Sequence, residues 1–169
     1  MNASSEALLA NVHPKLAYAI RTAYTSLLAH NPPVEIHVIQ GTRTYAQQQA
    51  LYMQSRTNPP TGPWVTNAPG GYSSHNYGLA VDIAPGIPGS PTWKPDWNWK
   101  DWDFQLVIAS LKSQGLAWGG DWVHTKGDYD HFYLPDSPPD PTPKMRADLI
   151  AGGLPLVYSE YDKGAYKVE

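Results

Sequence analysis

One carboxylate interrupts an apolar run in the segment SSHNYGLAVDIA, which covers residues 73–84. Asp82 stands inside the apolar stretch LAVDIA, and His75 precedes it by seven residues. A buried carboxylate without a partner costs several kcal/mol, so it needs a cation, a network of hydrogen-bond donors or a metal ion. The segment therefore predicts a buried polar site, and Gly78 permits a sharp bend that could turn His75 and Asp82 toward one spot.

A second histidine of interest follows two aspartates in the segment DYDHF at residues 128–132. Two histidines and one carboxylate are the ligand set of many catalytic zinc sites, which leave a fourth position for water. The chain contains no cysteine, so any metal must be held by His, Asp or Glu. His75, Asp82 and His131 are therefore candidate zinc ligands, although a histidine and an aspartate seven residues apart also occur often by chance.

The other four histidines are weaker candidates. His13 and His30 flank or end a predicted helix, and we interpret them as ordinary surface residues. His37 lies in a predicted strand, either as a residue of one face or as a support for a ligand. His124 lies seven residues before His131 and competes with it as a ligand, although a surface position in a turn is favoured.

Hydrophobic periodicity predicts the elements that must position these residues. The predicted helices cover residues 5–10, 14–29, 44–56, 101–115 and 143–150, and the predicted strands cover residues 34–40, 78–84, 116–123 and 129–134. Thr44 is a plausible N-cap, and Gly115 is suited to end a helix. The pattern predicts an α+β domain over residues 1–136, followed at 137–169 by a Pro-rich segment, a short helix and a polar tail.

Composition excludes several classes of protein. The chain has 169 residues, of which 41% are hydrophobic and 16% charged, so a globular domain with a core is expected. A net charge of −3 offers no basic field for nucleic acid or anionic lipid, and no apolar run is long enough to span a bilayer. The first residues lack the features of a signal peptide. We therefore expect a monomer made in the cytoplasm, with neither nucleic acid nor membrane as a partner.

The segment SSHNYGLAVDIAP resembles the S-x-H-x-x-G-x-A-x-D signature of the LAS-type zinc peptidases. This group includes D-alanyl-D-alanine carboxypeptidases, phage L-alanyl-D-glutamate endopeptidases and the hedgehog fold. The positions of the signature are filled by Ser73, His75, Gly78, Ala80 and Asp82. Three further segments are also similar to the family, namely QGTRTYAQQQALY at 40–52, WGGDW at 118–122 and DYDHF at 128–132. The resemblance is closest to the phage endolysin branch and covers roughly residues 34 to 134.

The resemblance implies a small central antiparallel sheet flanked by helices, and one Zn²⁺ per chain bound by His75, Asp82 and His131. It implies that Asp128 is the general base and that Arg43 stabilises an oxyanion or holds a substrate carboxylate. Ser73, Gln48 and Trp122 are the expected substrate-binding residues. In this interpretation the metal is the counter-charge that Asp82 requires.

Two questions stay open at this level. Strand alternation places Asp128 on the face opposite His131, whereas Asp130 is the immediate neighbour of His131. The residues alone do not choose between the two carboxylates; the resemblance selects Asp128, to which alternation does not apply if it lies in the turn before the strand. The loop at 91–100 contains three tryptophans, Trp93, Trp97 and Trp99, which either cover the core or line a substrate groove.

The sequence thus predicts a zinc peptidase that cleaves peptidoglycan stem peptides, favouring the L-alanyl-D-glutamate bond. The absence of a signal peptide favours an endolysin that acts on the cell wall after release. One alternative is a D-alanyl-D-alanine carboxypeptidase. Another is a zinc-containing binding module of the same fold without hydrolysis, which would be expected to have lost Asp128 or Arg43.

Overall fold

The computed structural model describes residues 1–87, 92–123, 127–138 and 140–167. Its contacts divide the chain into two compact units, and each unit is discontinuous in sequence. Unit 1 joins Met1–Gly41 to Ala80–Pro135, and unit 2 joins Thr42–Leu79 to Asp136–Glu169. The division into a domain at 1–136 and an appendage at 137–169 stays a prediction.

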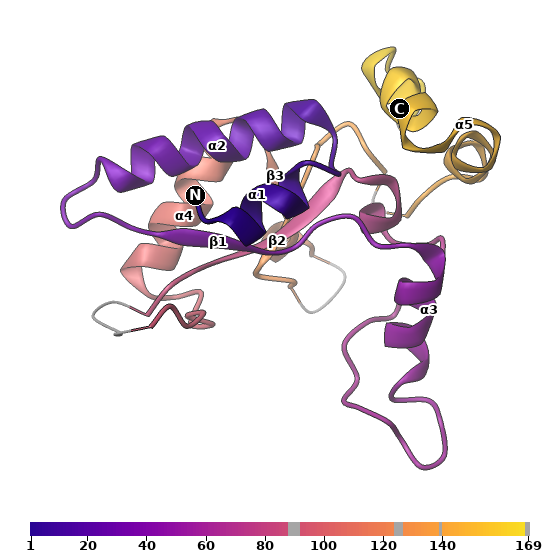
Figure 1. Ribbon diagram of the computed structural model, residues 1–169, viewed down its shortest axis with the longest axis horizontal. Helices are drawn as coiled ribbons and strands as arrows, with labels where there is room; N and C mark the ends of the chain where they lie inside the picture. Colours follow the sequence, from indigo (N-terminus) through magenta and orange to yellow (C-terminus); the bar gives the residue numbers. More distant parts are fainter. Residues whose placement is uncertain (88–91, 124–126, 139, 168–169) are drawn as a thin grey trace. The chain divides into compact units, whose positions relative to one another are not determined.

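Unit 1 contains a four-stranded antiparallel sheet in the order β1-β2-β4-β3. Its strands are β1 at Ile36–Gln40, β2 at Ala80–Pro85, β3 at Ala117–Trp118 and β4 at His131–Tyr133. Strands β1 and β2 run side by side in Figure 1. The expected α+β class with a small antiparallel sheet is confirmed. β3 is much shorter than the predicted strand at 116–123, because the chain turns at Gly119 into the 3-10 helix η2, Gly119–Asp121, and glycine is a poor strand residue.

The helices and the sheet of unit 1 share its core. The helices are α1 at Ala3–Leu9, α2 at Pro14–Leu28 and α4 at Trp102–Ser113. α1 packs on β1, α2 packs on α4, and α4 packs on β2 and β3. The apolar stripe predicted for α2 is buried at Leu16, Ile20, Ala23 and Leu27, while Leu28 is exposed. β2 is one of the two inner strands, and all its residues except Asp82 are buried, so the carboxylate does interrupt a buried strand.

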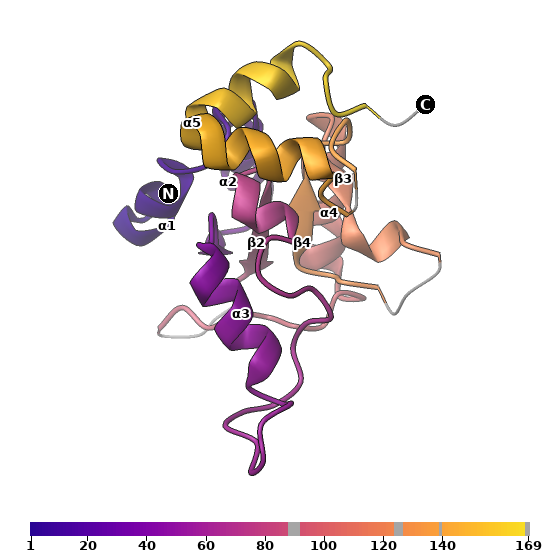
Figure 2. The same ribbon diagram turned by 90° about the vertical axis from the view of Figure 1, so that its right-hand side faces the viewer.

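Unit 2 consists of α3 at Tyr45–Met53, the 3-10 helix η1 at Ser74–Tyr77, and α5 at Pro143–Asp162. The predicted N-cap of α3 is confirmed: the Thr44 hydroxyl accepts from the Gln47 N–H, and the Gln47 side chain accepts from the Thr44 N–H. α5 packs against η1 (Figure 2). None of the helices in the described ranges is long and apolar enough to cross a membrane.

The C-terminal segment differs from its prediction. A short helix ending near residue 150 and a polar tail were expected, but the helical path continues to Asp162. Gly153 breaks it with a φ of 65° and a ψ of −163°, and Pro155 begins the second half. Val157 and Tyr161 are buried on that second half, so apolar burial sustains a helix beyond the end predicted near residue 150.

Candidate metal centre

The sheet register brings Asp82 and His131 together. The two residues are direct partners across the antiparallel pair β2 and β4, so their side chains leave the sheet on the same face. His131 Nδ1 lies 3.2 Å from Asp82 Oδ1. Both side chains are largely withdrawn from water, with exposed fractions of 6% and 15%. One strand pairing therefore supplies two of the three predicted ligands.

The third predicted ligand, His75, is positioned by the tight turn that leads into β2. Ser73 caps η1 by accepting from the His75 N–H at 3.4 Å. Gly78 follows the 3-10 helix in the left-handed conformation, with a φ of 64°, which a residue with a Cβ adopts only at a cost. The chain then enters β2 at Ala80. The sharp re-entry predicted at Gly78 is present.

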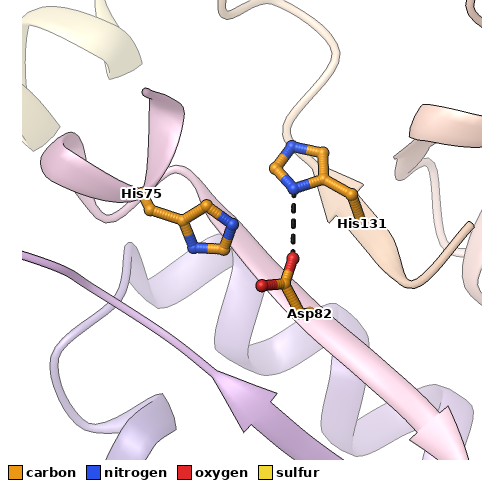
Figure 3. A group of neighbouring side chains, drawn as sticks. All are labelled: His75, Asp82 and His131. Atoms are coloured by element: carbon orange, nitrogen blue, oxygen red, sulfur yellow. Dashed lines mark hydrogen bonds and ion pairs between the residues drawn. The ribbon is translucent and has the colours of Figure 1, made fainter. Parts of the chain in front are cut away.

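His75, Asp82 and His131 form a group in which each residue offers one ligand atom, and these atoms all lie within 4.8 Å of one another. Figure 3 shows the two imidazole rings on either side of the Asp82 carboxylate. His75 is only 2% exposed. Two imidazoles and a carboxylate in a dry setting fit a divalent cation that prefers nitrogen and oxygen donors, because the cation would offset the charge that burial penalises. The group could hold a metal ion.

Asp128 lies in an irregular segment just before β4 and is exposed. The condition under which strand alternation does not apply to it is therefore met. Its N–H donates to Gly119 O at 3.2 Å, and its carbonyl accepts from the His131 N–H at 3.4 Å. A Cβ at Gly119 would lie 3.1 Å from both Asp128 Cβ and His131 Cβ. The absence of a side chain at Gly119 thus lets the Asp128 segment fold closely over the start of β4.

Asp130 differs from Asp128 in its environment. Burial, the nearby charge of Asp82 and a side-chain hydrogen bond with Asp128 raise the pKa of Asp130 to about 8. Asp130 is therefore protonated near neutral pH in the metal-free protein, and its O–H can donate to the Asp128 carboxylate. The Asp130 carbonyl accepts from the Ile83 N–H at 2.8 Å. Asp130 thus lies against both Asp82 and Asp128; the assignment of Asp128 as the general base stays a prediction.

Arg43 is held by a buried amide. Its Nη1 donates to Gln48 Oε1 at 2.8 Å, and its main-chain N–H donates to His75 O at 3.0 Å. Gln48 is fully buried. Its Nε2 donates to Ala68 O at 2.8 Å and to Thr66 Oγ1 at 3.3 Å. Both ends of the Gln48 amide are thus engaged by protein groups; its predicted contact with a substrate stays a prediction.

Trp122 packs beside the imidazole of His131. Their ring centroids are 5.3 Å apart, and Trp122 Nε1 donates to Tyr133 Oη at 3.1 Å. The hydrogen bond fixes the indole in this orientation, so Trp122 shields one side of the proposed ligand. Its predicted role toward a substrate, like that of Ser73, stays a prediction.

The three tryptophans of the 91–100 loop take different positions. Trp93 stacks on His37 with centroids 3.9 Å apart, which confirms His37 as a residue of one strand face. Trp99 stacks on Tyr129 with centroids 4.4 Å apart. Trp97 is 56% exposed. Two of the tryptophans therefore cover side chains of unit 1, and the third faces solvent.

The other three histidine candidates have different outcomes. His13 is buried, so its interpretation as a surface residue was wrong. It caps α2 by accepting from the Lys15 N–H through Nδ1 at 3.1 Å, a role that burial permits. His30 is exposed, as expected. His124 lies outside the described residues.

Sequence reasoning missed three contributors to the site. Gly119 was overlooked because its importance depends on residues nine and twelve positions later in the chain. Asn76 was overlooked because it fills an unspecified position between His75 and Gly78, although an Asn three residues after a Ser is a recognisable capping pattern. The stacking of Trp99 on Tyr129 has no local signal.

Comparison with known proteins finds similarity over the part of the chain that contains the candidate metal centre. Residues 66–134 match a family described as D-alanyl-D-alanine carboxypeptidase. The peptidoglycan L-alanyl-D-glutamate endopeptidase CwlK of Bacillus subtilis (strain 168) is 40% identical over 111 residues, which are 63% of this chain and 64% of that protein. The chain thus matches slightly less than two thirds of this relative. The crystal structure of the Serratia marcescens L-Ala D-Glu endopeptidase ChiX is similar with a TM-score of 0.52 and 26% identity, covering 79% of this chain and 88% of that one.

Proposed function

We propose that this chain is a member of the LAS-type peptidases and a zinc metallopeptidase that cleaves peptidoglycan stem peptides at the L-alanyl-D-glutamate bond. The observation that carries the proposal is the group of His75, Asp82 and His131 within the matched segment. The names of CwlK and ChiX supply the bond.

The proposed metal is one zinc ion per chain, held by His75, Asp82 and His131. The donor set supports zinc, because it offers two imidazoles and one carboxylate in a chain without cysteine. When bound, zinc supplies Lewis acidity, which lowers the pKa of water to about 7 and polarises a carbonyl oxygen.

The reaction proposed for the chain is hydrolysis of an amide. Asp128 accepts a proton from the attacking water, whose oxygen bonds to the carbonyl carbon of the substrate. Asp128 then returns this proton to the nitrogen of the leaving amine as the C–N bond breaks. Asp130, through its side-chain hydrogen bond with Asp128, keeps the Asp128 carboxylate oriented. The Arg43 guanidinium stabilises negative charge on the substrate, either at the oxyanion or at a carboxylate.

The remaining parts of the proposal rest on the sequence. Ser73 and Trp122 contact the stem peptide. The chain works as a monomer of the phage endolysin type, reaches the wall after release, and needs neither nucleic acid nor a membrane as a partner. The charge of −3 supports the exclusion of nucleic acid.

A second candidate is a D-alanyl-D-alanine carboxypeptidase, which the description of the matching family favours. Mass spectrometry of purified muropeptides with pentapeptide stems, digested by the zinc-loaded protein, separates the two activities. The endopeptidase yields fragments that begin with D-glutamate. The carboxypeptidase releases terminal D-alanine and leaves the alanyl-glutamate bond intact. Zinc binding without either product would contradict both and indicate a binding module.

A further inference from the structure

Asn76 uses its whole side chain to join two segments of unit 2. It is 2% exposed. Its Oδ1 accepts from the Gly71 N–H at 2.9 Å and from the Ser73 N–H at 3.4 Å. Its Nδ2 donates to Arg43 O at 2.9 Å and to Thr44 O at 3.3 Å. Two accepted and two donated bonds exhaust what a side-chain amide can form.

The two halves of this amide serve different purposes. The oxygen completes the capping box of η1 and ties down the loop before it. The nitrogen contributes nothing to that cap, because it points to the carbonyl groups of Arg43 and Thr44. A residue needed only to cap η1 would require only the oxygen.

The main chain at Arg43 is thereby clamped at both ends. Its N–H donates to His75 O at 3.0 Å, and its C=O accepts from Asn76 Nδ2 at 2.9 Å. His75 and Asn76, which are consecutive in η1, thus both hydrogen-bond to the main chain of Arg43 in the turn that precedes α3. The bonds are short and buried, and buried groups of this kind are costly to leave unpaired.

We propose that Asn76 is a positioning residue that fixes Arg43 relative to His75 through its Nδ2. The inference rests on the proposed function, since it concerns the group that stabilises charge in the hydrolysis. Asn76 acts through Arg43 and does not itself touch the substrate. The effect of losing Nδ2 therefore depends on whether Arg43 is present.

Asn76→Asp isolates the nitrogen. The variant keeps an oxygen for Gly71 and Ser73, loses both donations, and sets a carboxylate oxygen against the carbonyls of Arg43 and Thr44. Its matched control is Asn2→Asp: Asn2 also caps a helix through Oδ1, accepting from Ser5 N, while its Nδ2 contacts a different residue, His37. Asn76→Ser, which keeps a short neutral acceptor, serves as the second variant if Asn76→Asp fails to fold.

The first measurement is a double-mutant cycle on stem-peptide cleavage with Arg43→Ala. Replacing a residue that orients a functional group typically costs about 10-fold to 100-fold. We expect that loss in kcat/KM when Arg43 is present and a loss below about threefold in the Arg43→Ala background. The zinc Kd, measured by competition with a chelator, should stay within about threefold of wild type. Equal losses in both backgrounds, or a zinc affinity that falls with the activity, would indicate a structural role for η1 and overturn the proposal.

The second measurement does not depend on catalysis. Hydrogen exchange of the amide of Arg43 in the metal-free protein should be slow in wild type and in Asn2→Asp, and at least about tenfold faster in Asn76→Asp. Unchanged exchange in Asn76→Asp would overturn the positioning role, even if the wild-type protein cleaved no stem peptide. A wild-type protein that cleaves nothing but shows the expected exchange would refute the proposed function and leave the clamp standing.

Discussion

The two segments that build the proposed site are held in different ways. In residues 73–82, short-range contacts set the conformation: Ser73 caps η1, Asn76 closes the capping box, and Gly78 turns the chain into β2. In residues 118–131, Asp128 and His131 depend on a distant glycine, Gly119, which leaves space for them and accepts from the Asp128 N–H. The first segment therefore has a sequence signature, and the second is defined by packing.

The segments also differ in electrostatics. The histidine of the first is buried without a carboxylate next to it in sequence. The second concentrates two carboxylates beside Asp82, and the pKa of Asp130 rises to about 8 mainly because of burial. A carboxyl group kept neutral can orient a charged neighbour at no further electrostatic cost. The contrast suggests that the first segment serves metal binding alone. The second segment contributes His131 to the metal and also carries the carboxylates proposed for proton transfer.

The largest effect is expected at the residue that links the two segments. Asp82→Asn removes the only charged ligand in the group, so zinc should fall from one per chain to near zero by elemental analysis. Turnover should fall by more than the roughly ten-thousandfold that loss of a general base can cost. A protein that stays fully active after exhaustive chelation would contradict the metal assignment.

The next effect separates Asp128 from Asp130. Asp128→Asn removes a basic oxygen but keeps the size of the side chain, so turnover of stem peptide should fall by about 100-fold to 10,000-fold. Zinc content and melting temperature should stay near wild type. Asp130→Asn replaces a neutral acid by a neutral amide that can still donate to Asp128, so its loss should be much smaller.

The reverse outcome would exchange the two roles. If Asp130→Asn abolished turnover and Asp128→Asn had little effect, Asp130 would be the base. If neither change affected turnover, general-base catalysis by this segment would be wrong.

The third prediction concerns pH and the metal-free protein. The folded protein holds a proton on Asp130 up to a pKa of about 8, whereas an unfolded aspartate loses it near pH 3.9. Between these values the folded state binds more protons, so the free energy of unfolding should decrease as pH rises, by up to about 1.4 kcal/mol per pH unit. Denaturant titrations in chelator should show this slope, and Asp130→Asn should flatten it.

A matched variant serves as the control for this pH dependence. Asp121 is an exposed aspartate of the same region, and Asp121→Asn should leave the slope unchanged. A slope that survives in Asp130→Asn would mean that another group carries the proton.

The smallest effects are expected from alanine substitutions at two glycines, one in each segment. A Cβ at Gly119 would lie 2.5 Å from Asp128 O, so Gly119→Ala must displace the Asp128 segment and should cost about 1 to 3 kcal/mol of stability. Turnover should fall as well, because Asp128 moves. Equilibrium denaturation and kcat measure the two effects.

Gly78→Ala is the counterpart in the first segment. It strains a residue with a φ of 64° and should cost about 1 kcal/mol. Gly78→Ala should weaken zinc binding, whereas the pH dependence of turnover should stay close to that of the wild type. If Gly119→Ala proved as mild as Gly78→Ala, the packing argument for the second segment would fail.

The sequence by itself determined the elements and the ligands that local patterns encode. Periodicity predicted the helices of unit 1, Thr44 was recognised as a cap, and an aspartate inside an apolar strand called for a counter-charge. Such features depend on residues within a few positions of one another, and the physical cost of a buried charge is the same in any fold. The grouping of His75, Asp82 and His131 was implied by the resemblance to the LAS-type peptidases and is present.

Only the tertiary structure decided the features that depend on partners far along the chain. It set Asp128 against Gly119, placed the partly buried Asp130 near Asp82, and stacked Trp93 and Trp99 on side chains of unit 1. It also buried Val157 and Tyr161, and so continued to Asp162 a helix that was predicted to end near residue 150. Packing energy and pKa values arise from neighbours in space, which local sequence patterns do not specify.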